Sequence, residues 1–219
     1  MGLDRNGIRA LAVAGVLAAV LLPAAPGDAG GRRCDGRAVT HSGTSGNDNI
    51  EGTRGNDVIW AGDGDDKIST LLGEDVICAG RGNDFVGAGL SDDTIWGGGG
   101  RDRIKAGRGD DTVYGEDGAD RILAGDQSDV INGNAGPDYI DMGYGPTSRE
   151  GDEGFGGLGR DTLKTFGGVE AGHPPIRLFG NKGDDTLLGD DPAHRLDGGP
   201  GTDTCSPKTT RRNCEREGD

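Results

Sequence analysis

Between residues 43 and 141 the apolar residues of the chain recur with a period of nine. The block divides without gaps into eleven nonapeptides, since 11 × 9 = 99 residues, and each has a β-branched aliphatic residue at its eighth position. These residues are Ile50, Ile59, Ile68, Ile77, Val86, Ile95, Ile104, Val113, Ile122, Ile131 and Ile140. One β-branched residue between two variable positions, repeated at a fixed period, predicts short β-strands that each turn one side chain inward.

The sixth position of the repeat is an aspartate in every copy. These residues are Asp48, Asp57, Asp66, Asp75, Asp84, Asp93, Asp102, Asp111, Asp120, Asp129 and Asp138. Glycine occupies the fourth position in nine of the eleven copies, the exceptions being Ser91 and Gln127. Glycine permits positive φ and leaves its carbonyl uncovered. Each aspartate is therefore expected at a glycine-rich turn, directly before a strand.

Beyond this block the repeat continues in an interrupted, degenerate form over residues 142–206. One copy spans 156–164 with Asp161, and three more span 180–206 with Asp185, His194 and Asp203 at the sixth position. Segments 142–155 and 165–179 do not match the pattern and are predicted interruptions. Because His194 replaces an aspartate, fewer metal ions are expected past Met142.

The pattern resembles the RTX family of calcium-binding nonapeptides, G-G-x-G-x-D-x-U-x. The resemblance covers about 135 of the 219 residues (15 × 9). It implies an all-β fold, a parallel β-roll or right-handed β-solenoid, in which two nonapeptides make one coil. It also implies several bound Ca²⁺ ions as the cofactor and partner of the chain.

Coordination chemistry supports this implication independently. Coils stacked at about 4.8 Å would bring each turn beside the turn two repeats later. Each gap would then collect two carboxylates and several carbonyls, the hard oxygen ligands that Ca²⁺ prefers, and eleven copies would give nine gaps (11 − 2). The expected ligands are the eleven aspartates of the main block with Asp161, Asp185 and Asp203. Without metal, the chain is expected to be largely disordered.

Composition narrows the possible partners. The chain has 46 glycines and 4% aromatic residues, which disfavours a thick packed core. Its net charge of −15 argues against nucleic-acid binding and favours cations.

The first 29 residues have the layout of a secretory signal peptide: Arg5 and Arg9 lie near an apolar run from Ile8 to Leu22, and small residues follow up to Ala29. The run is short for a membrane span. We therefore expect a secreted, extracellular, monomeric protein, with an N-terminal cap segment at 30–42.

Four cysteines in an exported chain are expected to pair. Of the three possible connectivities, Cys34–Cys78 with Cys205–Cys214 is favoured, and the second bond would close the tail at 207–219.

The seventh and ninth positions should point outward, and alternate copies lie on opposite sheets. One face carries Trp60, Cys78, Trp96 and Tyr114. Its rings could bind a polysaccharide or cell wall, which is the alternative function. The other interpretation is that a Cys34–Cys78 bond draws the N-terminal segment across this row. The opposite face carries Lys67, Arg103, Lys105 and Arg121, interpreted as a solvated face.

No catalytic motif is recognisable in the sequence. Neither G-x-S-x-G nor H-E-x-x-H occurs, and His41, His173 and His194 stand in no acid–base arrangement. His41 falls where a degenerate preceding copy would place its inward residue. The sequence therefore predicts a non-enzymatic calcium-binding β-roll with a structural or surface-interaction role.

Overall fold

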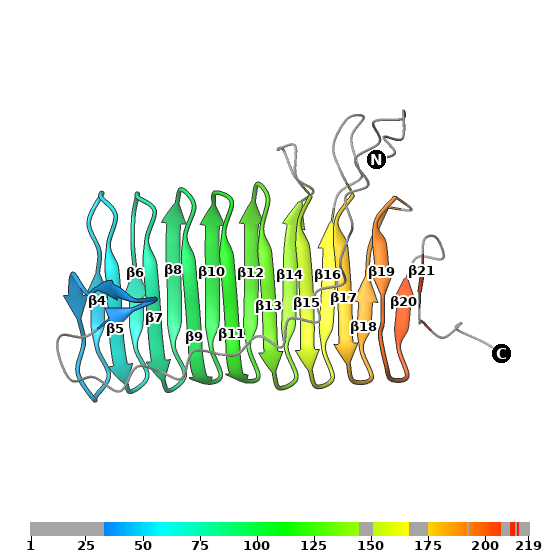
Figure 1. Ribbon diagram of the computed structural model, residues 1–219, viewed down its shortest axis with the longest axis horizontal. Helices are drawn as coiled ribbons and strands as arrows, with labels where there is room; N and C mark the ends of the chain where they lie inside the picture. Colours follow the sequence, from blue (N-terminus) through cyan, green and yellow to red (C-terminus); the bar gives the residue numbers. More distant parts are fainter. Residues whose placement is uncertain are drawn as a thin grey trace, which may run out of the picture.

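The computed structural model of the chain describes residues 33–144, 151–166, 175–191, 193–206, 211–212 and 214. Within these ranges all regular structure is β-strand, so none of them forms an apolar helix that could cross a membrane (Figure 1). The predicted signal peptide and most of the predicted tail lie outside the described residues.

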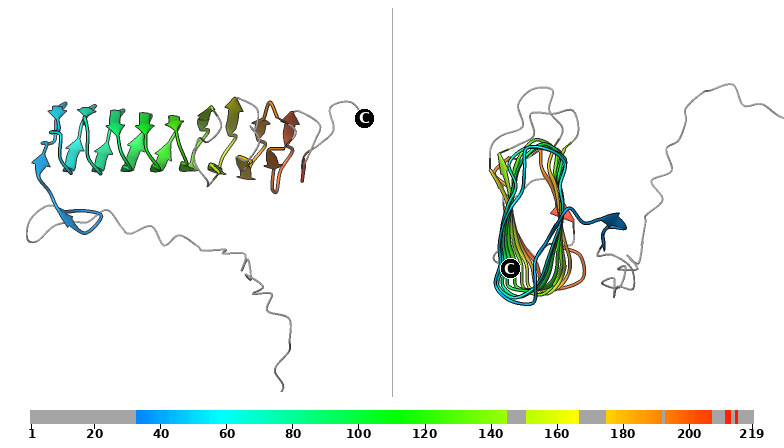
Figure 2. Two further views of the ribbon diagram at one scale, coloured as in Figure 1. Left: turned by 90° about the horizontal axis from the view of Figure 1, so that it is seen from above. Right: turned by 90° about the vertical axis from the view of Figure 1, so that its left-hand side faces the viewer.

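Successive strands alternate between two parallel sheets that face each other along a flattened solenoid (Figures 1 and 2). The nine-stranded sheet consists of β4 (Asn49–Glu51), β6 (Lys67–Ser69), β8 (Phe85–Leu90), β10 (Arg103–Arg108), β12 (Arg121–Asp126), β14 (Tyr139–Tyr144), β16 (Thr162–Phe166), β18 (Thr186–Leu188) and β20 (Thr204–Ser206). The ten-stranded sheet consists of β3 (His41–Ser42), β5 (Val58–Asp63), β7 (Val76–Arg81), β9 (Thr94–Gly100), β11 (Thr112–Gly118), β13 (Val130–Ala135), β15 (Glu153–Leu158), β17 (Arg177–Lys182), β19 (Arg195–Asp197) and β21 (Arg211–Arg212). The predicted parallel β-roll is confirmed.

Register confirms that each repeat stacks on the repeat two positions later. Ile104 pairs with Ile122 across β10 and β12, and Val113 pairs with Ile131 across β11 and β13. The eighth-position side chains thus form two inward ladders, and all except the first, Ile50, are fully buried.

The strands also bury a second side chain that the sequence did not predict. Most strands continue past the ninth position into the next repeat, so the residue two places after each Ile or Val also points inward. This second row is mainly glycine and alanine, and Ala61, Ala88 and Ala106 are fully buried. The prediction of one inward side chain per repeat was therefore wrong, because the strands are longer than three residues.

The two interruptions are shorter than expected. Asp152 and Ile176 stand at the sixth position of two further repeats, whose strands β15 and β17 lie in register with β13 and with each other. The net insertions are five residues before Asp152 (152 − 138 = 9 + 5) and six before Ile176 (176 − 161 = 9 + 6).

The repeat that contains Asp152 has a glycine, Gly154, at its eighth position, where every copy of the main block has Ile or Val. A Cβ on Gly154 would lie 3.0 Å from Sδ of Met142 and 3.2 Å from a methyl carbon of Leu178. Met142 occupies the second inward row, where other strands carry glycine, alanine or threonine, and is fully buried. Its longer side chain fills the space that Gly154 leaves open.

Both predicted disulfides are present, Cys34–Cys78 and Cys205–Cys214. The first holds the hairpin of β1 (Arg33–Cys34) and β2 (Arg37–Ala38) outside the ten-stranded sheet (Figure 2). Cys34 is fully buried there, and Val76 is only 1% exposed, although it is an outward residue of β7. Val130, at the same repeat position, is 42% exposed. The hairpin therefore covers the ten-stranded sheet around Cys78.

Candidate metal sites at the two turn edges

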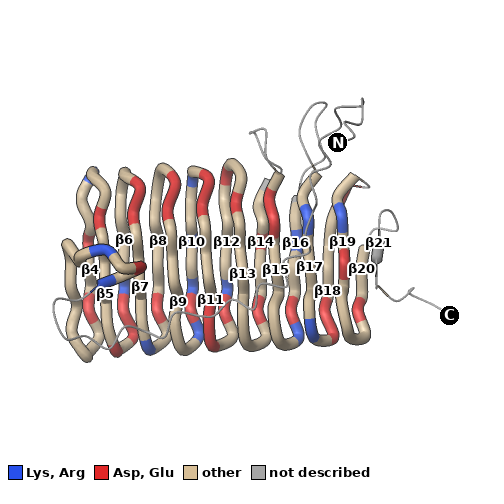
Figure 3. Tube along the Cα trace, in the orientation of Figure 1, with Lys and Arg blue, Asp and Glu red and all other residues tan. Residues whose placement is uncertain are grey.

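The sixth-position aspartates form two ladders, one along each edge of the solenoid where the chain turns. Each aspartate except the last of each ladder donates its backbone N–H to Oδ1 of the aspartate one coil later, over 2.7–3.1 Å. Acidic residues accordingly gather at the upper and lower turns in Figure 3.

We define the edges by their aspartates. The long edge precedes the nine-stranded sheet and consists of Asp48, Asp66, Asp84, Asp102, Asp120, Asp138, Asp161, Asp185 and Asp203. The short edge precedes the ten-stranded sheet and consists of Asp57, Asp75, Asp93, Asp111, Asp129 and Asp152. The structure thus places every predicted metal ligand in one of the two ladders, together with Asp152, which the sequence analysis missed.

The second carboxylate oxygen of almost every ladder aspartate is buried without a hydrogen-bond partner. These Oδ2 atoms belong to Asp66, Asp75, Asp84, Asp93, Asp102, Asp111, Asp120, Asp129, Asp138, Asp152, Asp161, Asp185 and Asp203. A buried, uncompensated carboxylate oxygen is strongly unfavourable. Thirteen such oxygens, repeated at every coil, indicate cation-binding sites.

The gap between Asp102 and Asp120 shows what surrounds such an oxygen. A Cβ added to Gly97 would lie 2.7 Å from Asp102 Oδ2 and 2.7 Å from the carbonyl oxygen of Gly115 on the next coil. Two oxygens from consecutive coils therefore border this space.

Backbone and carboxylate oxygens also lie close together at the glycine turns of these two coils. A Cβ added to Gly118, whose φ is +155°, would overlap the carbonyl oxygen of Gly100 and lie 3.2 Å from Asp120 Oδ1. Oxygens of two carboxylates and of backbone carbonyls therefore line the space between successive turns.

This donor set distinguishes among metals. The described residues contain no group of three or more His, Cys, Asp or Glu side chains that could hold a metal ion by themselves. A closed zinc site built from histidine and cysteine is therefore not formed in this part of the chain. Two carboxylates supplemented by carbonyl oxygens are instead a hard oxygen set that fits Ca²⁺.

The pKa values of the ladder aspartates show that ionised carboxylates are unfavourable in these gaps unless a cation is present. Burial raises the pKa of Asp84 to about 7, of Asp93 to about 8 and of Asp129 to about 9. Repulsion from neighbouring ladder carboxylates raises these values further, while the backbone N–H of the preceding ladder aspartate lowers them. A cation in the gap would keep these carboxylates ionised, so metal binding should release protons.

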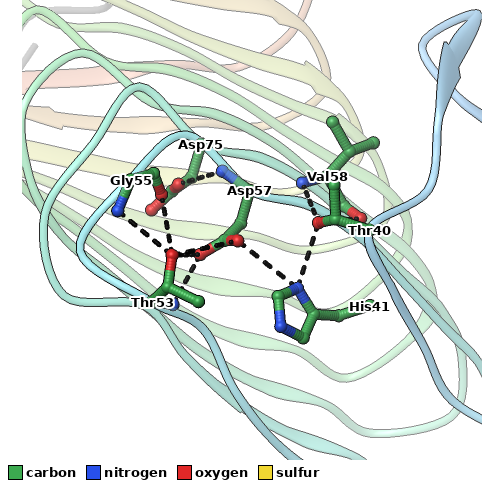
Figure 4. Close-up of polar contacts among 7 residues, drawn as sticks. All are labelled: Thr40, His41, Thr53, Gly55, Asp57, Val58 and Asp75. Atoms are coloured by element: carbon green, nitrogen blue, oxygen red, sulfur yellow. Dashed lines mark hydrogen bonds and ion pairs between the residues drawn. The ribbon is translucent and has the colours of Figure 1, made fainter.

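In the first aspartate of each edge, Oδ2 accepts hydrogen bonds from a nearby threonine. Thr44 donates its N–H (2.7 Å) and its hydroxyl (2.9 Å) to Asp48 Oδ2. Thr53 donates its N–H (2.6 Å) and its hydroxyl (3.1 Å) to Asp57 Oδ2, and Nδ1 of His41 lies 3.4 Å from Asp57 Oδ1 (Figure 4). These two predicted ligands therefore lie at protein-capped ends of the ladders.

The capped ends change the expected number of sites. The nine long-edge aspartates leave seven gaps after the capped one, and the six short-edge aspartates leave four. Eleven gaps thus combine an unsatisfied Oδ2 with a second carboxylate: seven lie within residues 43–141, for which the sequence count gave nine, and four lie beyond them.

The short edge ends at a histidine. Ile176, on the coil after Asp152, donates its N–H to Nδ1 of His194 over 3.2 Å. His194 is 1% exposed, so a ring nitrogen replaces the carboxylate oxygen of the ladder. The expectation of fewer ions past Met142 therefore applies to the short edge, because the long edge continues unbroken to Asp203.

A second ladder lies at the fifth position, which the sequence analysis did not single out. Asp65 donates its N–H to Asn47 Oδ1 (3.0 Å), and Asn83 donates its N–H to Asp65 Oδ1 (2.7 Å). The signal was the recurrence of Asn and Asp at this position. Asp152 could likewise have been found by counting nine residues back from Asp161.

Comparison with known proteins agrees with this geometry. The family model of the RTX calcium-binding nonapeptide repeat matches residues 42–77, 64–86, 79–113, 87–122, 114–143 and 177–205. Together these ranges cover 102 + 29 = 131 of the 219 residues, and the chain belongs to this family. A search of curated proteins found no match. The unmatched segment, 144–176, contains Asp152 and Asp161, which the structure places in the ladders.

Proposed function

We propose that this protein is an extracellular, non-enzymatic β-roll that binds about eleven calcium ions along its two turn edges and folds when it binds them. The observation that carries the proposal is the set of thirteen buried Oδ2 atoms without a partner, in a chain of the RTX calcium-binding repeat family. Calcium would supply the positive charge that these carboxylates lack.

Folding and metal binding are coupled in this proposal because the ladder aspartates are buried. Asp93, Asp111 and Asp129 are each at most 2% exposed and stack at consecutive coils of one edge. Without cations, the fold must desolvate and align these like charges or protonate them. The unfolded chain avoids that cost, so it is favoured until calcium is present.

An extracellular location is supported by two features. The layout of residues 1–29 is typical of a signal peptide. The disulfides Cys34–Cys78 and Cys205–Cys214 are typical of proteins outside the reducing cytosol. Extracellular calcium is also in the millimolar range where weak sites fill.

A non-enzymatic role is supported by the positions of the two described histidines. His41 lies beside Asp57 at the capped start of the short edge, and His194 terminates the same edge. Both histidines contact ladder residues, so each has a structural role that requires no catalytic function.

Circular dichroism with and without calcium tests the proposal. In excess EDTA we expect a largely disordered spectrum, and a cooperative gain of β signal as Ca²⁺ reaches the millimolar range. Mg²⁺ at the same concentration should give much less signal, because it requires tighter octahedral geometry and retains its waters. A full β spectrum in EDTA that calcium does not change would refute the proposal.

Ring geometry does not favour the alternative of sugar binding through the aromatic face. Trp96 and Tyr114 stack with centroids 5.7 Å apart and an interplanar angle of 16°. Phe155 and Phe179, which extend the same row, stack at 5.0 Å and 8°. Within each pair the facing surfaces are occupied by the partner ring. One face of each of these four rings is therefore closed to a sugar.

A further inference from the structure

The outer face of the nine-stranded sheet has an unusual charge for so acidic a chain. The seventh- and ninth-position residues of β6, β8, β10 and β12 are Lys67, Ser69, Phe85, Gly87, Arg103, Lys105, Arg121 and Leu123, and the flanking strands β4 and β14 place Glu51 beside Ser69 and Asp141 beside Leu123. Four of these eight residues are cations and none is acidic, although the chain carries a net charge of −15. We call Lys67, Arg103, Lys105 and Arg121 the cationic face.

These cations differ from the basic side chains elsewhere on the solenoid, several of which are paired with an acid one coil away. Arg108 pairs with Asp126 at 3.0 Å, and Lys164 pairs with Asp141 at 2.9 Å. The ion pairs found within the described residues include no member of the cationic face, and all four of its side chains are exposed. Their charge is directed to solvent.

Aromatic neighbours orient two of these cations without neutralising them. Nζ of Lys105 lies 5.7 Å from the centroid of the Phe85 ring, and Cζ of Arg121 lies 4.5 Å from that of Tyr139. Such contacts restrain a flexible side chain while its charge remains available to a ligand.

Sheet register places the cations along the solenoid axis. Lys67 pairs with Phe85, Phe85 with Arg103, and Arg103 with Arg121. Three strand spacings of about 4.8 Å separate Lys67 from Arg121, so the row extends over roughly 14 Å of parallel sheet. A linear polymer lying along the axis would meet Lys67 and Arg103 about 10 Å apart, and Arg103 and Arg121 about 5 Å apart.

We propose that the cationic face binds a linear polysaccharide that carries carboxylates on its sugars. The charge is complementary, and a polymer running along the row would contact all four cations. Single-stranded nucleic acid is disfavoured, because cations lie over the rings of Phe85 and Tyr139 on which bases would stack, and duplex DNA is one arm of the test below. The inference rests on the proposed calcium-driven fold, since eleven Ca²⁺ ions would bring +22 to the edges and offset the net −15.

The direct test uses fluorescently labelled hyaluronan oligosaccharides, which carry a carboxylate on alternate sugars, with the full protein in millimolar calcium and low salt. The triple variant Arg103→Gln/Lys105→Gln/Arg121→Gln removes three charges from the cationic face. The control Arg108→Gln/Arg160→Gln/Arg177→Gln removes three paired charges from elsewhere on the solenoid. We expect the first variant to bind at least tenfold more weakly, the control to stay within twofold of wild type, and high salt to weaken binding.

Folding is separated from binding by recording the calcium transition of each variant by circular dichroism. An unchanged transition with lost hyaluronan binding supports the inference and leaves the calcium proposal intact. Absence of hyaluronan binding by the folded wild type, or equal loss in both triple variants, overturns it. Equal or tighter binding of neutral dextran, dextran sulfate or duplex DNA overturns the choice of a carboxylated polysaccharide.

Discussion

Asp102 donates its backbone N–H to Oδ1 of Asp120 across 2.8 Å, while its own Oδ2 is buried without a partner. One residue thus takes part in two functions. Its backbone holds consecutive coils together, and its carboxylate is directed at the gap between them. The same relationship recurs along both edges and links the fold to the expected metal.

Replacing an interior ladder aspartate should remove more calcium than replacing a capped one. Asp102→Asn affects the gaps on both sides of this residue, so we expect up to two fewer ions by calorimetry and a higher calcium midpoint. Asp48→Asn should leave the ion count unchanged, because Thr44 already satisfies Oδ2 of Asp48. Equal losses in the two variants would contradict the assignment of Asp48 to a capped end.

His194 should stabilise the fold by accepting the hydrogen bond from the backbone N–H of Ile176. His194→Ala leaves the N–H of Ile176 buried and unpaired and opens a cavity, at an expected cost of about 2–4 kcal/mol. His194→Asn retains a hydrogen-bond acceptor and should recover part of this loss. Denaturant unfolding in saturating calcium measures both variants, and no loss in the alanine variant would contradict the ladder role.

Without calcium, stability should fall as pH rises. Burial raises the pKa of Asp111 to about 6, of Asp93 to about 8 and of Asp129 to about 9, all above the unfolded value of 3.8. The folded metal-free state therefore binds more protons at these groups than the unfolded chain, so their contribution to stability is fully present below pH 3.8 and is lost as pH rises through 6 to 9. Circular dichroism in EDTA should show more β structure at pH 5 than at pH 8.

Calcium binding should show the opposite pH dependence. Protons compete with Ca²⁺ for the same carboxylates, so the calcium midpoint should rise as pH falls from 8 to 5. Calorimetry in buffers of different ionisation enthalpy should detect proton release at pH 7. A midpoint independent of pH, with no protons released, would contradict the raised pKa values.

The two turns that lack the fourth-position glycine should be strained. Ser91 has φ of +82° and Gln127 has φ of +89°, a region that L-residues rarely adopt. Ser91→Gly and Gln127→Gly should each stabilise the calcium-loaded fold by about 1 kcal/mol. The control Arg101→Gly, in a turn residue outside the positive-φ set, should be neutral or destabilising. Thermal unfolding distinguishes these outcomes, and destabilisation by the first two substitutions would contradict the strain.

The sequence predicted the features that depend on the period of nine. The inward ladder of Ile and Val and the turn position of the aspartates follow from spacing and composition. The n to n + 2 stacking was implied by the resemblance to the RTX family, and the disulfide pairing was favoured among three connectivities without being settled by the sequence. Asp152 and Ile176 were missed because insertions of five and six residues shift the frame, and because Gly154 stands where an aliphatic residue marks other copies.

Other features depend on contacts between coils, which the period alone does not reveal. Thr44 and Thr53 cap the first aspartates through side-chain conformations specific to the ends of the solenoid. The difference between the long and short edges appears only when alternate repeats are assigned to opposite turns. The side chain of Met142 on one sheet fills the space left by Gly154 on the other sheet, and this compensation is visible only in the folded core.

The most direct test of the central claim is a crystal structure of the calcium-loaded protein, with the ions located by anomalous scattering. The geometry predicts eleven ions, seven on the long edge between Asp66 and Asp203 and four on the short edge between Asp75 and Asp152. Calcium absent from these gaps, or ions bound at exposed acidic residues instead, would contradict it.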